Sequence, residues 1–156
     1  LRCAAENAIP IINYNDCVSS EENRKWEIAK LHREKGDKVV ELIDNDETAA
    51  QVACLVKSRL LVILTNLDGI YADIKNPDSL IREISGKDAA EVIANIDEVK
   101  KNCVGASRAG ANGAKAKLEY IKPCVENGTK VIIASSRYDL SDIVAERVPC
   151  TIVAAR

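Results

Sequence analysis

The order of hydrophobic and polar positions along the chain predicts alternating helices and strands. Residues 60–64 form a continuous aliphatic run, which is typical of a strand buried on both faces. Residues 130–134 (KVIIA) are predicted as a second buried strand, and residues 150–154 as a further strand. Between the runs, apolar residues recur at helical spacing over 49–56 and 89–96. The pattern therefore predicts an α/β fold with a largely parallel sheet and helices on both faces.

Proline, glycine and acidic residues mark the predicted ends of these elements. A third helix is predicted over 114–127, where Pro123 implies a kink or a break and Gly128 suits the position just after the helix. Asp46 is expected to cap the helix that follows it. Near the N-terminus, residues 8–13 are interpreted as a short buried strand.

Composition narrows the possible functions of this domain. Apolar residues make up 47% of the chain but include no Phe or Met, so the core must be built from Ile, Val, Leu and Ala. The net charge of −2 and the absence of a basic run argue against a nucleic-acid partner. The sequence shows no apolar run of membrane-spanning length and no signal peptide, which predicts a cytoplasmic protein without a membrane partner.

The six cysteines and the single histidine predict no catalytic nucleophile. No two cysteines form a C-x-x-C pair, so we interpret them as reduced core thiols, with a zinc site or a disulfide framework as the alternative. His32 lies in the highly charged segment 20–36, where a solvated helix is expected and a lid or an oligomer contact is the alternative. No Ser/His/Asp or Cys/His arrangement is therefore predicted.

Polar clusters follow two of the predicted strands. Asn13 and Asp16 lie at the end of the first strand, predicted at 8–13. The triplet 44–46 (Asp-Asn-Asp) follows the second, interpreted at 38–43 from a weak alternation, and opens a helix. Ligands of open α/β sheets collect at the carboxyl ends of the strands. Two carboxylates around an amide suit the orientation of a lysine, a magnesium-bound phosphate or a substrate amine. The alternative is that Asp46 only caps its helix and Asp44 only turns the chain.

A third candidate is the small-residue stretch 110–113 (Gly-Ala-Asn-Gly). It precedes a predicted helix that contains Lys115 and Lys117. Small residues let backbone amides approach an anion, and a helix N-terminus favours phosphate. The G-x-x-x-x-G-K-[ST] spacing of a Walker A motif is absent, and an ordinary flexible loop is the alternative.

Taken together, these segments resemble a known family. The segments 9–22 (IPIINYNDCVSSEE), 44–71 (DNDETAAQVACLVKSRLLVILTNLDGIY) and 110–119 (GANGAKAKLE) occur in the order found in the glutamate 5-kinases, members of the amino acid kinase superfamily. The resemblance implies a three-layer αβα sandwich over residues 1–156. It implies ATP-dependent phosphorylation of the side-chain carboxylate of L-glutamate, giving glutamyl 5-phosphate for proline biosynthesis. ATP and Mg²⁺ are the implied cofactors, and a homo-oligomer is expected.

The resemblance also implies roles for individual residues. Asp46 matches the carboxylate that organises the catalytic lysines, and Lys117 matches the lysine that meets the transferred phosphoryl group. No residue is assigned as a metal ligand. The glutamate-binding set is Asn13, Asp16 and Asn45. The nucleotide-binding set is Thr65, Asn66, Asp68, Gly69, Tyr71, Gly110, Gly113 and Lys117.

Several positions depart from the family pattern. The stretch 110–117 lacks two threonines and one glycine of the usual block, and Asn66 replaces the usual Asp. Residues 20–43 form a charged insertion or lid, and the family's N-terminal part is expected to be missing. Two alternatives therefore stay open: an amino acid kinase with a different acceptor, and a non-catalytic nucleotide-binding relative.

Overall fold

The computed structural model describes residues 2–12, 45–103 and 113–156. The chain divides into two compact units, Leu1–Thr48 and Ala49–Arg156. The predicted charged insertion at 20–43 lies outside the described residues. In the first unit, the described residues form α1 (Arg2–Ala5) and the first turn of α3 (Asn45–Val56).

The predicted strand at 8–13 is wrong for the residues that the structure describes. Residues 8–12 form no strand, and Ile9 and Ile11 are 91% and 94% exposed. The backbone N–H of Ala8 instead donates to the carbonyl of Cys3 at 2.8 Å and closes α1. An aliphatic run becomes a strand only when a neighbouring strand pairs with its backbone.

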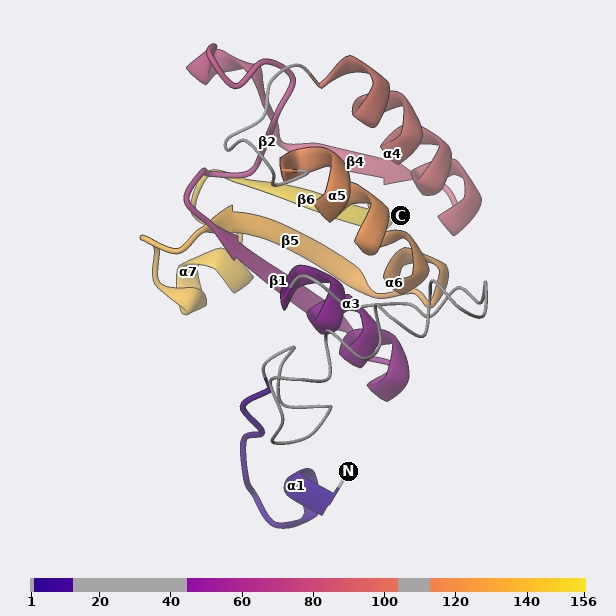
Figure 1. Ribbon diagram of the computed structural model, residues 1–156, viewed down its shortest axis with the longest axis vertical. Coiled ribbons are helices and arrows are strands. Elements are labelled where there is room, and N and C mark those ends of the chain that lie inside the picture. The colour runs from indigo at the N-terminus through magenta and orange to yellow at the C-terminus, as the bar shows by residue number, and fades with distance from the viewer. Residues whose placement is uncertain (1, 13–44, 104–112) are drawn as a thin grey trace, which may run out of the picture. The chain divides into compact units, whose positions relative to one another are not determined.

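The second unit is built on a four-stranded sheet (Figure 1). Two of its neighbouring pairs are parallel and the central pair is antiparallel, so the prediction of a largely parallel sheet is confirmed with one antiparallel step. The strands, in spatial order, are β1 (Leu60–Thr65), β5 (Lys130–Ser135), β6 (Cys150–Ala155) and β4 (Glu83–Gly86).

A short hairpin after β1 was not predicted. It pairs β2 (Ile70–Tyr71) with β3 (Leu80–Ile81) in antiparallel register, and the turn η2 (Pro77–Ser79) precedes β3. Strands of two residues carry no periodic signal. The local sequence signal here is the dipeptide Asn76-Pro77, which is typical of a turn. The Asn76 side chain accepts a hydrogen bond from the N–H of Asp78 at 3.0 Å.

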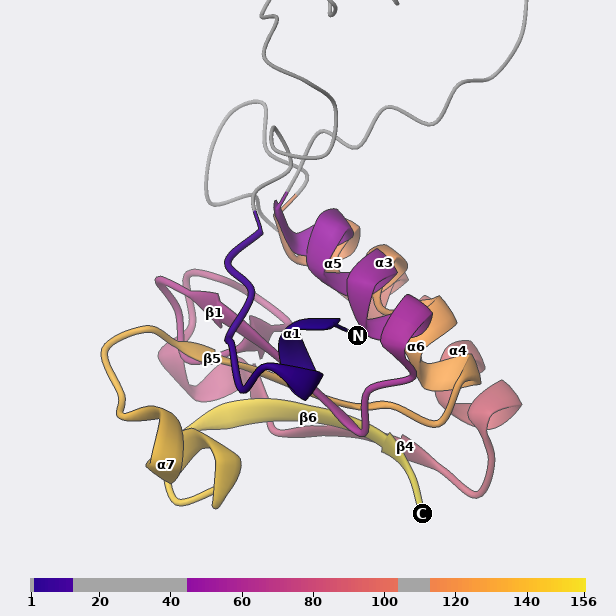
Figure 2. The same cartoon turned by 90° about the horizontal axis from the view of Figure 1, so that it is seen from below.

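Helices cover both faces of the sheet, as predicted (Figure 2). Buried aliphatic side chains of the strands alternate between the two faces, so β5 packs against helices on one side and against α7 on the other. One face carries α3 from Ala49 onward, α4 (Ala89–Asn102), α5 (Gly113–Tyr120) and α6 (Lys122–Glu126), and the other carries α7 (Leu140–Val144).

Burial of β1 on both faces was predicted, and the structure confirms this prediction only in part. Leu61 and Ile63 are buried under the helices, whereas Leu64 is 51% exposed. Leu60 and Val62 are partly buried against the cluster that contains Ile143 of α7. β1 lies at one edge of the described sheet, so it is less covered than β5. The aliphatic run alone did not reveal this difference, because a half-buried strand can also be continuously apolar.

The predicted helix ends are confirmed with one shift. The helix predicted over 114–127 breaks between α5 and α6, with Pro123 in the first turn of α6. Gly128 follows α6 with φ of +78°, the left-handed conformation expected after a helix. Asp46 lies within the first turn of α3 rather than at its cap, because the helix already begins at Asn45. An acidic side chain is favourable there as well.

The N-terminus of α4 provides a test of capping. Asp88 Oδ1 accepts a hydrogen bond from the N–H of Glu91 at 2.9 Å, and Glu91 Oε2 accepts one from the N–H of Lys87 at 2.9 Å. We expect Asp88→Ala to lower the free energy of unfolding by about 1 kcal/mol, because a helix N–H loses its partner. Asp139→Ala is the matched control, since Asp139 precedes α7 without a side-chain capping bond. Urea denaturation of both variants measures the difference, and equal losses would contradict the capping role.

Four charged side chains join α4 to α5 and α6. Lys122 Nζ lies 2.7 Å from Asp97 Oδ1 and 2.9 Å from Glu119 Oε2, and Lys100 pairs with the same two carboxylates. The hydrogen bond from Lys122 lowers the pKa of Asp97 below its ordinary value. This cluster fixes the C-terminal half of α4 relative to the end of α5 and the start of α6.

The described cysteines are free thiols. Cys103, Cys124 and Cys150 are buried, whereas Cys3 is exposed and does not occupy the predicted core position. Cys54 Sγ and Cys124 Sγ are 3.4 Å apart, and burial, together with that contact, raises the pKa of the Cys124 thiol to about 12. Among the described residues no three His, Cys, Asp or Glu side chains gather in a way that would hold a metal ion. None of the helices in these ranges has the length and apolar character needed to cross a membrane.

Candidate active site

One edge of the sheet brings three strand ends together. β1 and β5 are parallel and in register from Leu60–Lys130 to Thr65–Ser135, so both end at this edge. The N–H of Ser136 donates to the carbonyl of Thr65 at 2.9 Å and joins the two ends. Because β6 is antiparallel to β5, it begins at the same edge. The loop from Thr65 to Tyr71 leaves the sheet there.

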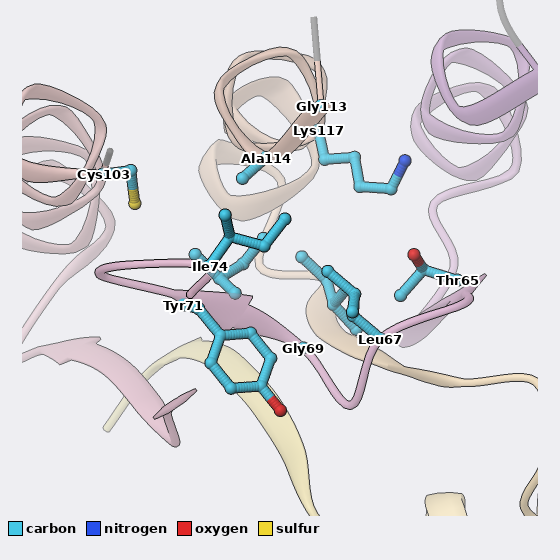
Figure 3. A pocket seen from close by; sticks show the side chains of 11 residues that line it. Thr65, Leu67, Gly69, Tyr71, Ile74, Cys103, Gly113, Ala114 and Lys117 are labelled. Carbon is cyan, nitrogen blue, oxygen red and sulfur yellow. The ribbon is translucent and has the colours of Figure 1, made fainter. Parts of the chain in front are cut away.

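A hollow of about 50 Å³ lies between this loop and the helix face (Figure 3). Among the residues that the structure describes, Lys117 is the one cationic side chain in its lining. Figure 3 shows the Lys117 side chain extending from α5 over the end of β1, where Leu67 and Thr65 lie. The lining residues are Thr65, Leu67, Gly69, Ile70, Tyr71, Ile74, Cys103, Gly113, Ala114, Lys117 and Ile133.

The chemistry of this lining suits an anion. Gly113 and Ala114 begin α5, so backbone N–H groups of the first helical turn lie beside the hollow. Lys117 follows one turn later on the same helix. A helix N-terminus and an ammonium group both favour negative charge, and together they favour a phosphate.

Thr151 anchors the loop on the sheet. Its hydroxyl accepts a hydrogen bond from the N–H of Ile70 at 2.8 Å and donates one to the carbonyl of Ile81 at 2.6 Å. Gly69 packs closely here, because a Cβ at this position would lie 2.8 Å from the backbone nitrogen of Thr151. The predicted loop glycine is therefore required by the approach of two backbones. Sequence reasoning missed Thr151, since nothing in the sequence showed that its strand runs antiparallel.

The predicted loop residues fall into two groups. Thr65, Gly69 and Tyr71 line the hollow, whereas Asn66 and Asp68 are not among the lining residues. Asp68 instead contacts Arg137, whose Nη2 lies 2.7 Å from Oδ1 and 2.9 Å from Oδ2. Arg137 was missed by sequence reasoning, although its place directly after β5 was a usable signal.

Tyr71 is coupled to this ion pair. Burial and the charge of Asp68 raise the pKa of Tyr71 above its ordinary value. The phenol therefore stays protonated at neutral pH and acts as a neutral hydrogen-bond donor.

The remaining predicted residues belong to the other compact unit or lie outside the described residues. Asn45 and Asp46 lie in the first turn of α3, within the first compact unit. Asn13, Asp16 and Gly110 lie outside the described residues. The glycine-containing stretch and its helix thus contribute two predicted residues, Gly113 and Lys117, to the described lining of the hollow.

A larger hollow of about 470 Å³ lies near β4 and α4. Of the described residues that line it, Glu83 and Glu98 are charged and none is a lysine or arginine. Two carboxylates repel a phosphate. The smaller hollow at the strand ends is therefore the better candidate for an anionic ligand.

Comparison with known proteins identifies relatives of this chain. A sequence model of the amino acid kinase family matches residues 1–135. The glutamate 5-kinase of Streptococcus suis (strain 05ZYH33) is 32% identical over 139 residues, which cover 86% of this chain and 32% of that protein. The glutamate 5-kinase of Caldanaerobacter subterraneus is 33% identical over 133 residues, covering 84% of this chain and 30% of that protein. The chain thus spans about a third of the length of these curated relatives.

A solved structure supports the fold. The carbamate kinase from Giardia lamblia bound to AMP-PNP superposes with a TM-score of 0.53 at 22% identity, covering 76% of this chain and 34% of that protein. At this identity the likeness concerns the fold, a sheet flanked by helices on both faces.

Proposed function

Because this chain belongs to the amino acid kinase family, we propose that it takes part in ATP-dependent phosphorylation of the side-chain carboxylate of L-glutamate. The observation that carries this proposal is the position of Lys117 in a hollow at the strand ends, beside the N-terminus of α5. We take L-glutamate as the proposed acceptor because the curated relatives are named glutamate 5-kinases. Glutamyl 5-phosphate is the proposed product, which enters proline biosynthesis.

Lys117 is proposed to bind the phosphoryl group that moves. Phosphoryl transfer requires alignment of donor and acceptor and neutralisation of charge on the equatorial oxygens, with little acid–base chemistry. An ammonium group beside a helix N-terminus provides such neutralisation. In this proposal the loop from Thr65 to Tyr71 holds the nucleotide against α5.

The described residues form one wall of a nucleotide site. Their hollow of about 50 Å³ is far smaller than the roughly 300–1,000 Å³ of typical ligand clefts. We therefore assign it to the phosphate end of the nucleotide. The proposed contact of Gly110 belongs to a stretch outside the described residues.

Mg²⁺ is proposed to arrive with the nucleotide. The described part of the lining contains no carboxylate, and Mg²⁺ in kinases is held largely by substrate phosphates. A bound Mg²⁺ would offset phosphate charge. The residues of this chain act on the nucleotide without a metal cage of their own among the described positions.

The acceptor side of the proposal rests on the sequence. Asn13, Asp16 and Asn45 are proposed to bind glutamate, and Asp46 to orient the catalytic lysine. On the same basis we expect a cytoplasmic protein that forms a homo-oligomer.

The proposed function is tested by acceptor-dependent ADP release with MgATP. We expect release with L-glutamate and little with L-aspartate, carbamate or UMP, in the chain itself or in the longest natural product of its gene. Faster release with another acceptor would replace glutamate by that acceptor. Nucleotide binding without release for any acceptor would favour the non-catalytic relative, an alternative suggested by Asn66 and the altered stretch at 110–117.

A further inference from the structure

A cluster of side chains outside the hollow connects two loops at the same edge of the sheet. Asp68 belongs to the loop after β1, and Arg137 and Tyr138 belong to the loop after β5. Arg137 Nη2 donates to both carboxylate oxygens of Asp68 and, at 2.6 Å, to the hydroxyl of Tyr138. Its guanidinium carbon lies 4.7 Å from the centre of the Tyr138 ring. The arginine is therefore held on two sides, by a charge and by an aromatic face.

Asp68 occupies a central position in this cluster. Its side chain is only 19% exposed, so its charge depends strongly on local partners. It accepts hydrogen bonds from Arg137, and its charge acts on Tyr71, which lines the hollow. Leu67 and Gly69, on either side of Asp68, line the hollow as well. A movement of Asp68 would therefore displace three lining residues.

Other hydrogen bonds also hold the loop, and they differ in kind from the contact between Asp68 and Arg137. Thr65 is fixed by the N–H of Ser136 and Ile70 by the hydroxyl of Thr151. Both are bonds of strand ends to the buried sheet. The middle of the loop is held at Asp68 by Arg137, whose side chain is 62% exposed. Substitution of Arg137 thus releases the middle of the loop without opening the core.

We propose that Arg137 is a positioning residue, which acts through Asp68 to hold the loop from Thr65 to Tyr71 in the conformation that binds the phosphate end of a nucleotide. This inference rests on the proposed function for the identity of the ligand. Arg137 does not touch the ligand in this proposal. Its loss should weaken nucleotide binding and leave the chemical step and the acceptor site nearly unchanged.

A matched control is present in the chain. Arg147 pairs with Asp142 through Nη2 at 2.6 Å and Nε at 2.9 Å, and its side chain is 64% exposed, close to the value for Arg137. This pair lies on α7 and its end, and neither residue lines the hollow. Arg147→Gln therefore removes an ion pair with a similarly exposed arginine, although with a more exposed carboxylate (39% for Asp142 against 19% for Asp68), without touching the loop.

Arg137→Lys is the conservative variant. All three polar contacts of Arg137 are made by one nitrogen, Nη2, so a single ammonium nitrogen can replace it in kind. We expect Arg137→Lys to retain most of the nucleotide affinity and loop protection that Arg137→Gln loses. A role that depended only on packing of the guanidinium plane against Tyr138 would show no such rescue.

The test combines amide hydrogen exchange of the ligand-free protein with nucleotide affinity. For Arg137→Gln we expect exchange in residues 66–70 to be about threefold faster and the Kd for MgATP to rise about fivefold, as for loss of one charged hydrogen-bond pair. With turnover, the KM for MgATP should rise while kcat and the KM for glutamate stay within about twofold. Arg147→Gln should change none of these quantities, and Arg137→Lys should lie near the wild-type values.

Three other outcomes would each contradict a specific part of the proposal. Unchanged exchange in Arg137→Gln would overturn the loop contact. Faster exchange with unchanged affinity and KM would overturn the positioning role. A wild-type protein that binds no nucleotide, combined with faster exchange in the variant, would reject the proposed function and the nucleotide role together, while the contact between the loops would stand.

Discussion

Replacement of Lys117 by alanine is expected to lower kcat for phosphoryl transfer by about a hundredfold to a thousandfold, with the fold intact. Lys117 is the cation in the lining of the hollow at the strand ends, and its ammonium is placed to bind the charge that develops on the transferred group. The side chain is only partly buried and lies outside the core cluster, so thermal stability should change little. Steady-state ADP release and a thermal melt measure the two effects.

Lys115→Ala is the control for this prediction. Lys115 lies on the same helix α5, is exposed, and is not among the lining residues. Its loss removes one positive charge from the helix without removing one from the hollow, so turnover should stay within about twofold. Unchanged turnover in Lys117→Ala, or an equal loss in both variants, would remove Lys117 from the proposed mechanism.

Gly69→Ala is expected to lower the free energy of unfolding by about 2 kcal/mol and to weaken nucleotide binding by about tenfold or more. The added Cβ would lie 2.8 Å from the backbone nitrogen of Thr151, so the loop must move away from β6. Thr151 cannot yield easily, because its hydroxyl is bonded to both Ile70 and Ile81. Chemical denaturation and a nucleotide titration measure the two losses.

Gly128→Ala separates this contact from the general cost of replacing a glycine. Gly128 has φ of +78°, and no atom lies within 4 Å of a Cβ added there. Its replacement should cost about 1 kcal/mol through the left-handed backbone and leave nucleotide affinity unchanged. If Gly69→Ala were no more harmful than Gly128→Ala in both measurements, the close approach to Thr151 would not matter in solution.

The elements predicted well are those whose signal is local. The aliphatic runs of β1 and β5 and the apolar spacing of α4 each extend over several residues. Pro123 removes a backbone donor and Gly128 admits a left-handed conformation, so the break and the end of the helices were also visible. In the candidate site, Lys117 and the loop from Thr65 to Tyr71 were predicted from a family resemblance together with the strand-end rule.

The features that were missed depend on partners distant in sequence. Whether residues 8–12 pair with another strand, and whether β6 runs parallel or antiparallel to β5, is decided by contacts that no local pattern encodes. Thr151 reaches the loop only because β6 is reversed. Arg137 meets Asp68 across 69 residues of sequence, although each follows a predicted strand. The strand-end rule predicted where chemistry gathers, but not which side chains touch.

The hollow at the strand ends has a further consequence for divergence within the family. Cys103 at the end of α4 and Gly113 at the start of α5 both line it, and the charged cluster of Lys100, Lys122, Asp97 and Glu119 ties these helices together. None of these four charged residues is among the described lining residues, so substitutions in the lining leave this support between the helices in place. Selection can thus alter the ligand preference of the hollow while the sheet and its helices stay the same.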